Sequence, residues 1–285
     1  MDIMNRLDTD TRARVISCLV EGCSIRSTVR VTGVSKKAVM RLLVDAGRVC
    51  YEYQDRAFRD LTSRRVQVDE LWSWIGCKAR NVTPEIKEKN PHAGDVWLWV
   101  AIDADTKLVL SHFVGDRSPR VAFAFMQDVA ERMAGRVQLT SDGLYWYPHA
   151  VENAFGIDVD YAVQMKHFAG DGHAGRYSPG RFTGSTKEVI KGDPDPKHIS
   201  TSFVERQNWT VRTTMRRYTR LSNGFSRKLE NHAAAVALNY FVYNFVRIHR
   251  TLRTSPAMAA GVTSKLWEVS DLVGLLEAEE AKKVA

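Results

Sequence analysis

The chain has 285 residues, of which 44% are hydrophobic and 26% are charged. A chain of this length and apolar content can bury a substantial core in one large domain or two smaller ones, which excludes a chain that is disordered throughout. No apolar stretch reaches the roughly 18 residues of a membrane span, and the first residues do not resemble a secretory signal. The four cysteines form no C-x-x-C pair, so we expect a cytoplasmic protein without a disulfide framework or a zinc site.

The net charge of +8 is concentrated in two segments. Residues 206–253 contain ten arginines and lysines against one acidic residue, and residues 1–65 contain thirteen basic against eight acidic side chains. Such clustering of one sign is typical of a surface that binds a polyanion. The alternative interpretation is a set of solvated helix faces without a partner.

Three short helices are predicted over residues 11–48 from apolar residues at helical spacing. Ser24 and Ser35 precede the second and third helices and can cap their N-termini. Gly33 and Gly47 mark the positions where these two helices would end. The sequence therefore predicts a compact helical unit at the N-terminus.

Two helices joined by a short glycine-containing turn, with basic residues at the start of the second, form the arrangement of a helix-turn-helix. In this interpretation Lys36, Lys37 and Arg41 face DNA, and residues 1–60 form a DNA-binding domain. A small helical bundle without a DNA partner shows similar periodicity and is the alternative.

From residue 66 onward the pattern changes to strands. Three apolar runs joined by polar segments predict an antiparallel meander, after which two strands alternate with helices. This order is expected of an RNase H-like α/β domain with a mixed five-stranded sheet, here preceded by the helix-turn-helix. The predicted strands cover residues 66–78, 96–103, 107–115, 137–142 and 159–168, and the predicted helices cover residues 118–134 and 148–155.

Residues 169–202 break this regularity, because they contain six glycines and three prolines and are typical of a long loop that is functional or disordered. Helical character returns over residues 203–218 and again over residues 224–247. We place a catalytic domain at residues 61–222 and a C-terminal helical region at residues 223–285.

Three carboxylates stand out by their positions. Asp69 lies inside the first predicted strand, on the face opposite Glu70, and Asp142 follows the fourth strand, which would run parallel beside the first. The carboxyl ends of strands are where open α/β sheets place their sites. Glu205 opens the helix after the long loop. Hard oxygen ligands of this kind suit Mg²⁺ or Mn²⁺, and two ions about 4 Å apart can clamp a phosphoryl transfer.

Each acid also has an ordinary structural interpretation. Asp142 precedes Gly143, and this pair is common in turns. Glu205 lies three residues after Ser202, which is the spacing of a capping box. Asp69 could pair with a buried arginine. In this strand order the three acids together favour a metal site.

At these acids the sequence resembles the DDE transposases of bacterial insertion sequences, in particular the insertion sequence one type. The most specific part is Glu205 followed seven residues later by Arg212, two positions on one face of a helix. The resemblance covers about residues 66–260. It rests on VDELWSWIG around Asp69, TSDG around Asp142, and SFVERQNWTVRTTMRRYTRLSNGFSRKLENH from Ser202.

The ending YNFVRIHRTLRTSPA is also similar to that of many such transposases, and we interpret its Asn244, Arg247 and His249 as structural. The N-terminus departs from the family, because members often carry a cysteine-rich zinc element before the helix-turn-helix and this sequence has none. The departure concerns how DNA would dock, whereas the chemistry would be the same.

The resemblance implies a metal-dependent DNA transposase. Asp69, Asp142 and Glu205 would hold two Mg²⁺ or Mn²⁺ ions, with Arg212 as a further catalytic residue beside them. The enzyme would cleave the ends of its element to free 3′-OH groups and join these to target DNA. Further DNA contacts are expected from a stripe of arginines on the Glu205 helix and from Trp209, which would stack on a base or else belong to the core. The expected arginines are Arg212, Arg216 and Arg220 on the stripe, with Arg217 beside them.

The implied partners are double-stranded DNA, as terminal inverted repeats and as target, and further copies of this chain, because two DNA ends must be brought together. The implied location is the bacterial cytoplasm, at the nucleoid. Two alternatives remain. One is an RNase H-like nuclease or resolvase that cleaves without joining, and the other is a DNA-binding regulator without catalysis.

Overall fold

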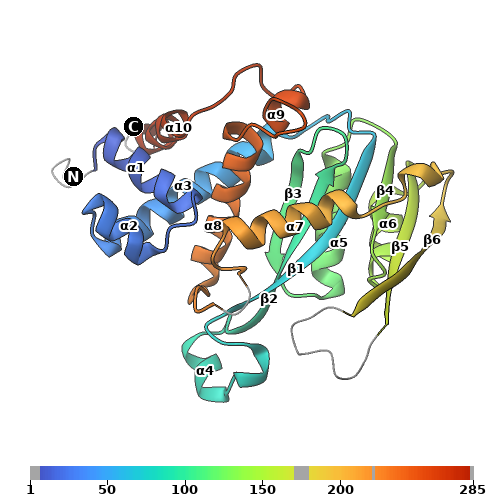
Figure 1. The fold of residues 1–285 in the computed structure, drawn as a ribbon, viewed down its shortest axis with the longest axis horizontal. Helices are drawn as coiled ribbons and strands as arrows, with labels where there is room; N and C mark the ends of the chain where they lie inside the picture. Colours follow the sequence, from blue (N-terminus) through green and yellow to red (C-terminus); the bar gives the residue numbers. More distant parts are fainter. Residues whose placement is uncertain (1–6, 170–179, 220–221, 283–285) are drawn as a thin grey trace.

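The computed structural model describes residues 7–169, 180–219 and 222–282 and has a mixed α/β fold. A six-stranded sheet forms its centre, in the order β3-β2-β1-β4-β5-β6. Helix α7 crosses one face of this sheet, α5 and α6 cover the other, and the remaining long helices gather beside it (Figure 1). Within the described ranges, no helix has both the length and the apolar character needed to cross a membrane.

The first five strands have the predicted connectivity. The meander pairs β1 with β2 and β2 with β3 in antiparallel fashion, and β4 and β5 continue the sheet parallel to β1. The meander strands are β1 (Arg65–Ile75), β2 (Gly94–Asp103) and β3 (Val109–Gly115), and the parallel strands are β4 (Val137–Ser141) and β5 (Val159–Ala169). The prediction of a meander followed by alternating helices and strands is therefore confirmed.

The predicted five-stranded sheet is wrong by one strand. Strand β6 (Arg181–Lys191) pairs antiparallel with β5, inside the segment that the sequence suggested was a loop. Almost every side chain of β6 is exposed, so the strand lacks the alternating burial that marks a strand in a sequence. Its pairing with β5 is what makes it a strand. Residues 170–179 of the predicted loop lie outside the described residues.

The side chains of β1 alternate between two cores on opposite faces of the sheet. Val66 and Val68 belong to the larger core, which includes α5 and α6 and continues into the N- and C-terminal helices. Leu71 belongs to the smaller core, where it lies with Val204 and Val211 of α7. This alternation determines which face each neighbouring polar residue of β1 occupies.

The helix that follows the meander begins at a serine cap. Helix α5 (Pro119–Glu131) starts after Ser118, whose side chain accepts a hydrogen bond from the Val121 backbone N–H, and α6 (Tyr147–Phe155) follows β4. A short 3₁₀ turn (Ala79–Asn81) and α4 (Pro84–Lys89) connect β1 to β2.

The N-terminal helices are α1 (Thr9–Val20), α2 (Ile25–Thr32) and α3 (Lys36–Ala57). The predicted caps are confirmed, because Ser24 and Ser35 each accept a hydrogen bond from a backbone N–H three residues later. Gly33 ends α2 in the left-handed conformation, at a φ of 71°, which suits a residue without a Cβ.

Helix α3 is longer than predicted, because Gly47 lies in its interior and does not end it. The reason is a close approach to α8 (Leu229–Phe241). A Cβ at Gly47 would lie 2.3 Å from the carbonyl oxygen of Ala234 and 2.5 Å from its Cα. This glycine therefore serves helix packing, which a sequence pattern does not distinguish from a helix end.

The C-terminal part begins with α8, five residues later than the predicted start at residue 224, and α8 changes to a π-helical turn at Val242–Val246. The short α9 (Pro256–Ala259) and α10 (Val269–Lys282) follow. The structural interpretation of Asn244 is confirmed. Its buried side chain accepts a hydrogen bond from the Val109 N–H at 3.0 Å and donates to the Val109 carbonyl at 2.9 Å and to Gln54 at 3.0 Å, linking β3 to α3.

Candidate active site

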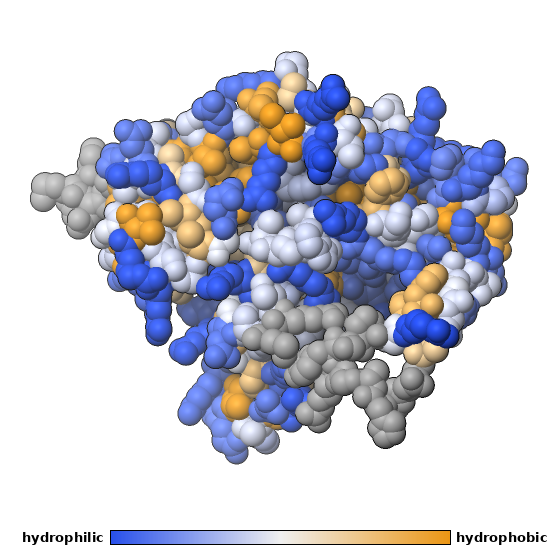
Figure 2. Space-filling model, viewed as in Figure 1, coloured by the Kyte–Doolittle hydropathy of each residue, from blue (hydrophilic) through white to orange (hydrophobic). Residues whose placement is uncertain are grey.

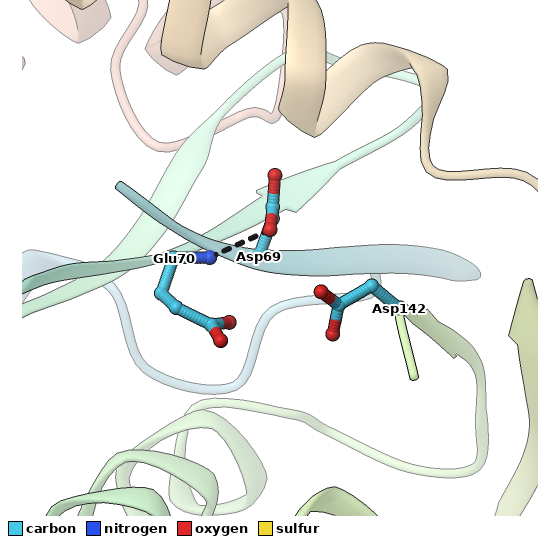
Figure 3. Close-up of side chains that lie close together, drawn as sticks. All are labelled: Asp69, Glu70 and Asp142. Carbon is cyan, nitrogen blue, oxygen red and sulfur yellow. Dashed lines mark hydrogen bonds between the residues drawn. The ribbon is translucent and has the colours of Figure 1, made fainter. Parts of the chain in front are cut away.

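Two of the predicted acids meet where neighbouring parallel strands lie side by side. Asp69 lies in the middle of β1, and Asp142 directly follows β4, which pairs with β1 so that Gln67 is opposite Thr140. Glu70 joins them, since carboxylate oxygens of Asp69, Glu70 and Asp142 lie within 4.8 Å of one another. Figure 3 shows Asp142 beside β1, with Asp69 and Glu70 extending from opposite sides of that strand. These three residues form the acid cluster.

The alternation of β1 gives the two neighbouring acids different partners. Asp69 faces α7 (Ser202–Thr214), and its Oδ2 atom accepts a hydrogen bond from the Asn208 side chain at 2.8 Å. Glu70 faces α6, and its buried carboxylate accepts hydrogen bonds from the Tyr147 hydroxyl at 2.8 Å and from Arg117 at 2.7 Å. Glu70 is thus paired inside the protein, whereas Asp69 has no cationic partner within the described part of the chain.

Burial and mutual repulsion make the acid cluster unfavourable when all its members are ionised. Burial, with the nearby carboxylates of Asp142 and Glu70, raises the pKa of Asp69 from 3.8 to about 8. Burial likewise raises the pKa of Asp142 and of Glu70, although the positive charge of Arg117 opposes this in both. A cluster of this kind favours a bound cation, because burial disfavours the ionised carboxylates and a cation compensates their negative charge.

Glu205 lies near the acid cluster without belonging to that group of three. Its carboxylate pairs with Lys166 of β5 and accepts a hydrogen bond from the Thr201 hydroxyl at 2.7 Å. Its negative charge nevertheless contributes to the raised pKa of Asp69. The structure thus places all three predicted acids in one region, with Glu205 held by a lysine.

The capping-box interpretation of Glu205 is wrong. Ser202 is the first residue of α7, and the side chain of Gln67 accepts hydrogen bonds from the Phe203 and Val204 N–H groups at 2.8 and 3.2 Å. Two of the N–H groups at the start of the helix are therefore satisfied from β1. Glu205 contacts the N-cap residue Thr201 through its hydroxyl, whereas a capping box uses the backbone N–H, which here bonds to Gln164.

Two glutamines fix the start of α7 against the sheet. Gln67 lies two residues before Asp69 on the same face of β1, and Gln164 of β5 accepts a hydrogen bond from the Thr201 N–H at 3.0 Å. The helix that carries Glu205 and Asn208 is therefore anchored to both strands that flank β4. This anchoring sets the position of both side chains relative to Asp69.

The predicted stripe of arginines is wrong in its geometry, because α7 ends at Thr214 and Met215 leaves the helical conformation to pack in the smaller core. Arg216 is exposed in the following turn. Arg217 is mostly buried, donates a hydrogen bond to Ser226 at 2.9 Å, and has a pKa lowered by burial. Of the predicted stripe, Arg212 lies on α7, and Arg220 lies outside the described residues.

The other predicted DNA-binding side chains lie on the surface. Trp209 is 53% exposed, with the Arg206 guanidinium 4.3 Å from its ring centre, so its interpretation as a core residue is wrong. Lys36, Lys37 and Arg41 are exposed at the start of α3. Their DNA contacts stay predictions.

Four residues of the site are not among the predicted site residues: Glu70, Arg117, Lys166 and Asn208. Glu70 was assigned to the far face of β1, which is correct, but it reaches the acid cluster from that face. Arg117 and Lys166 come from the loop before α5 and from β5, so only the folded chain brings them to the acids. Asn208 lies three residues after Glu205, and this helical spacing is the one feature of the sequence that places it on the same helix face as Glu205.

The residues present fit a hard divalent cation. The acid cluster offers carboxylate oxygens, which Mg²⁺ and Mn²⁺ prefer. In addition, the side-chain oxygen of Asn208 is buried and finds no hydrogen-bond partner among the residues that the structure describes, while its nitrogen contacts Asp69. An unsatisfied oxygen beside buried carboxylates is the donor set expected at a cation site.

No family model matches the sequence, and no curated protein matches it significantly. Among solved structures, the chain is similar to one in the simian T-cell lymphotropic virus intasome in complex with PP2A regulatory subunit B56 gamma, with 12% identity over 90% of this chain and 77% of that chain and a TM-score of 0.42. It is also similar to the piggyBac transposase in a synaptic complex with hairpin DNA, with 9% identity over 97% of this chain and 72% of that chain and a TM-score of 0.44. These are distant likenesses, so the case for a function rests on the side chains of the site.

Proposed function

We propose that this protein is a metal-dependent DNA transposase that cleaves the ends of its element and joins them to target DNA. The observation that carries the proposal is the acid cluster, partly buried at neighbouring parallel strands and flanked by Glu205. An RNase H-like arrangement of strands β1 to β5 is consistent with their order in the sheet. The net charge of +8 suits a polyanionic substrate.

Asp69, Asp142 and Glu205 are the residues proposed to hold two Mg²⁺ or Mn²⁺ ions, and Glu70 borders them from the other face of β1. When bound, such ions stabilise the charge that develops as a phosphodiester is cleaved or transferred. For Glu205 to take part, its carboxylate must exchange Lys166 for the ion.

The other side chains position these acids and the DNA. Asn208 orients Asp69 by its 2.8 Å hydrogen bond, and Tyr147 with Arg117 holds Glu70 in place. Arg212 shares α7 with Glu205 and is proposed to contact the DNA backbone beside the acids. Trp209, Arg216 and Arg217 stay candidates for further DNA contacts, of which Trp209 and Arg216 are exposed.

The test is a cleavage and joining assay with purified protein and Mg²⁺. Labelled duplexes from the two ends of the encoding element serve as donors, and a supercoiled plasmid serves as target. We expect nicking at the donor ends and covalently joined donor–plasmid products. Asp142→Asn controls for contaminating nuclease. Nicks without joined products would favour the nuclease or resolvase, and binding without either product would favour the regulator.

We also propose that α2 and α3 act as a helix-turn-helix that selects the element's ends. The charge reversals Lys36→Glu, Lys37→Glu and Arg41→Glu together should remove the preference for end sequences, because these exposed side chains begin α3. Each DNA phosphate that the variant no longer neutralises should lower the slope of log Kd against log salt by about 0.9. Binding titrations at several salt concentrations measure both effects.

The matched control reverses three exposed charges on the 3₁₀ turn and α4, which connect β1 to β2, as Arg80→Glu, Lys87→Glu and Lys89→Glu. It makes the same change in net charge and should keep the end preference. Equal end preference in both triple variants would contradict the helix-turn-helix assignment.

A further inference from the structure

The β5–β6 hairpin exposes an aromatic pair that no core absorbs. Phe168 and Phe182 lie directly opposite each other in the ladder, 53% and 56% exposed, with their rings edge to face at 5.9 Å. At the end of the hairpin, Figure 2 shows moderately hydrophobic surface on both sides of a strongly hydrophilic side chain. Two exposed phenylalanines at such a position have an energetic cost in water, and this calls for a ligand that covers them.

The aromatic pair lies on the face of the hairpin that carries the site. The pairing shifts register between His167 and Phe168, and the extra residue, Thr183, lies on β6. Along β5 side chains two apart share a face, so Phe168 shares its face with Lys166 and Gln164. Lys166 pairs with Glu205, and Gln164 bonds to Thr201 at the start of α7. Two residues of a strand span about 7 Å, which places the aromatic pair one step beyond the lysine that contacts Glu205.

The charges around the pair identify the class of ligand. Arg181, next to Phe182, is exposed and lies opposite Ala169, and Lys166 lies two residues before Phe168 on β5. Exposed rings next to cations bind nucleic acid with unpaired bases, because each base has a face that stacks on a ring while the cations attract the backbone. Inside a paired duplex, both faces of each base are already stacked on neighbouring bases.

We propose that Phe168 and Phe182 stack on an unpaired base of the DNA substrate, so that this protein binds ends with unpaired nucleotides in preference to blunt ends. This inference rests on the proposed function and specifies its substrate class. The hairpin then holds the strand next to the acids, through the same face that contacts Glu205.

The experiment compares two probes in the absence of divalent cations, so that cleavage plays no part. One is a blunt duplex of about 20 base pairs, and the other is the same duplex with a short 3′ overhang that contains 2-aminopurine. We expect wild-type protein to bind the overhang probe more tightly and to quench its fluorescence by stacking. Phe168→Ala and Phe182→Ala should each weaken overhang binding about 5- to 100-fold and leave blunt binding unchanged.

Two further variants separate stacking from burial of apolar surface. Phe168→Leu keeps an apolar side chain without a ring and should lose the quenching. Ile190→Ala removes an exposed apolar side chain from β6 away from the aromatic pair and should behave as wild type. The alternative is that a second copy of the chain covers the aromatic pair. Light scattering on all variants measures their oligomeric state and detects this.

Equal binding of both probes by wild-type protein would overturn the proposal, as would full quenching in Phe168→Leu. A dimer that dissociates in the phenylalanine variants, with unchanged DNA binding, would assign the pair to self-association instead. The outcome is independent of the transposase assay. Overhang preference without cleavage would contradict the proposed function alone, and cleavage without overhang preference would contradict this inference alone.

Discussion

Asp69→Asn is expected to make the metal-free protein more stable at alkaline pH while it abolishes DNA cleavage and joining. The Asp69 side chain is largely removed from water and lies among other acids, and this raises its pKa to about 8. At pH 8 to 9 the wild-type protein therefore carries a buried negative charge that costs free energy. Asn keeps the shape without the charge, and the unsatisfied Asn208 oxygen can turn to accept a hydrogen bond from it.

The sign of the pH dependence follows from the direction of the shift. Because the pKa of Asp69 is higher in the folded than in the unfolded protein, its protonated form stabilises the fold at low pH. That contribution is lost as pH rises from about 4 to about 8, at up to about 1.4 kcal/mol for each pH unit. The free energy of unfolding of Asp69→Asn should fall less steeply across this window.

Denaturant unfolding from pH 5 to pH 9, with and without Mg²⁺, measures this effect. Mg²⁺ should raise the stability of the wild-type protein at pH 8 by binding the folded state, and should have little effect on Asp69→Asn. Cleavage should fall by about 10²- to 10⁴-fold when this metal ligand is removed. The control Asp158→Asn changes an exposed acid before β5. It should alter neither the stabilisation by Mg²⁺ nor the cleavage rate. An Asp69→Asn protein that is less stable than wild type at pH 8 to 9, and that Mg²⁺ still stabilises, would contradict the cation site.

Glu205→Gln is expected to fold normally and bind terminal DNA, but to cleave it about 10²- to 10⁴-fold more slowly. Gln keeps an oxygen for the Thr201 hydroxyl and loses the charge that an ion requires. The ion pair with Lys166, which this variant removes, is partly exposed and contributes at most about 1 kcal/mol to stability. The start of α7 should stay intact, because Gln67 caps it.

Glu152→Gln is the matched control for this variant. Glu152 pairs with Lys191 of β6 and is exposed on α6, so the change breaks a similar ion pair away from the acid cluster. Initial cleavage rates with Mg²⁺, together with unfolding curves for both variants, separate the two roles. A Glu205→Gln protein that cleaves at the wild-type rate would remove Glu205 from the site and the DDE assignment with it.

The sequence alone predicts those features that arise from local chemistry and regular patterns. Ser24 and Ser35 cap their helices as expected, because a capping side chain acts on N–H groups two or three residues away. The meander and the alternating helices and strands were predictable, because each of these elements buries an apolar face and its apolar residues recur in the sequence at a helix or strand spacing. Asp69 was recognisable because an acid is unusual inside a strand, and Asp142 because it directly follows the strand that runs parallel beside the first.

Only the tertiary structure decided features that depend on partners distant in the chain. Gly47 continues a helix because α8 approaches it, and β6 is a strand because β5 pairs with it, although neither has a local signal. Gln67 caps α7 in place of the capping box that was the alternative interpretation of Glu205, since a side chain from β1 reaches the start of that helix. The site depends on the same long-range contacts: Lys166 reaches Glu205 across 39 residues of sequence, and Tyr147 reaches Glu70 across 77. Residue types and spacings indicate which side chains can do chemistry, whereas burial and three-dimensional proximity determine which of them meet and how their charges are compensated.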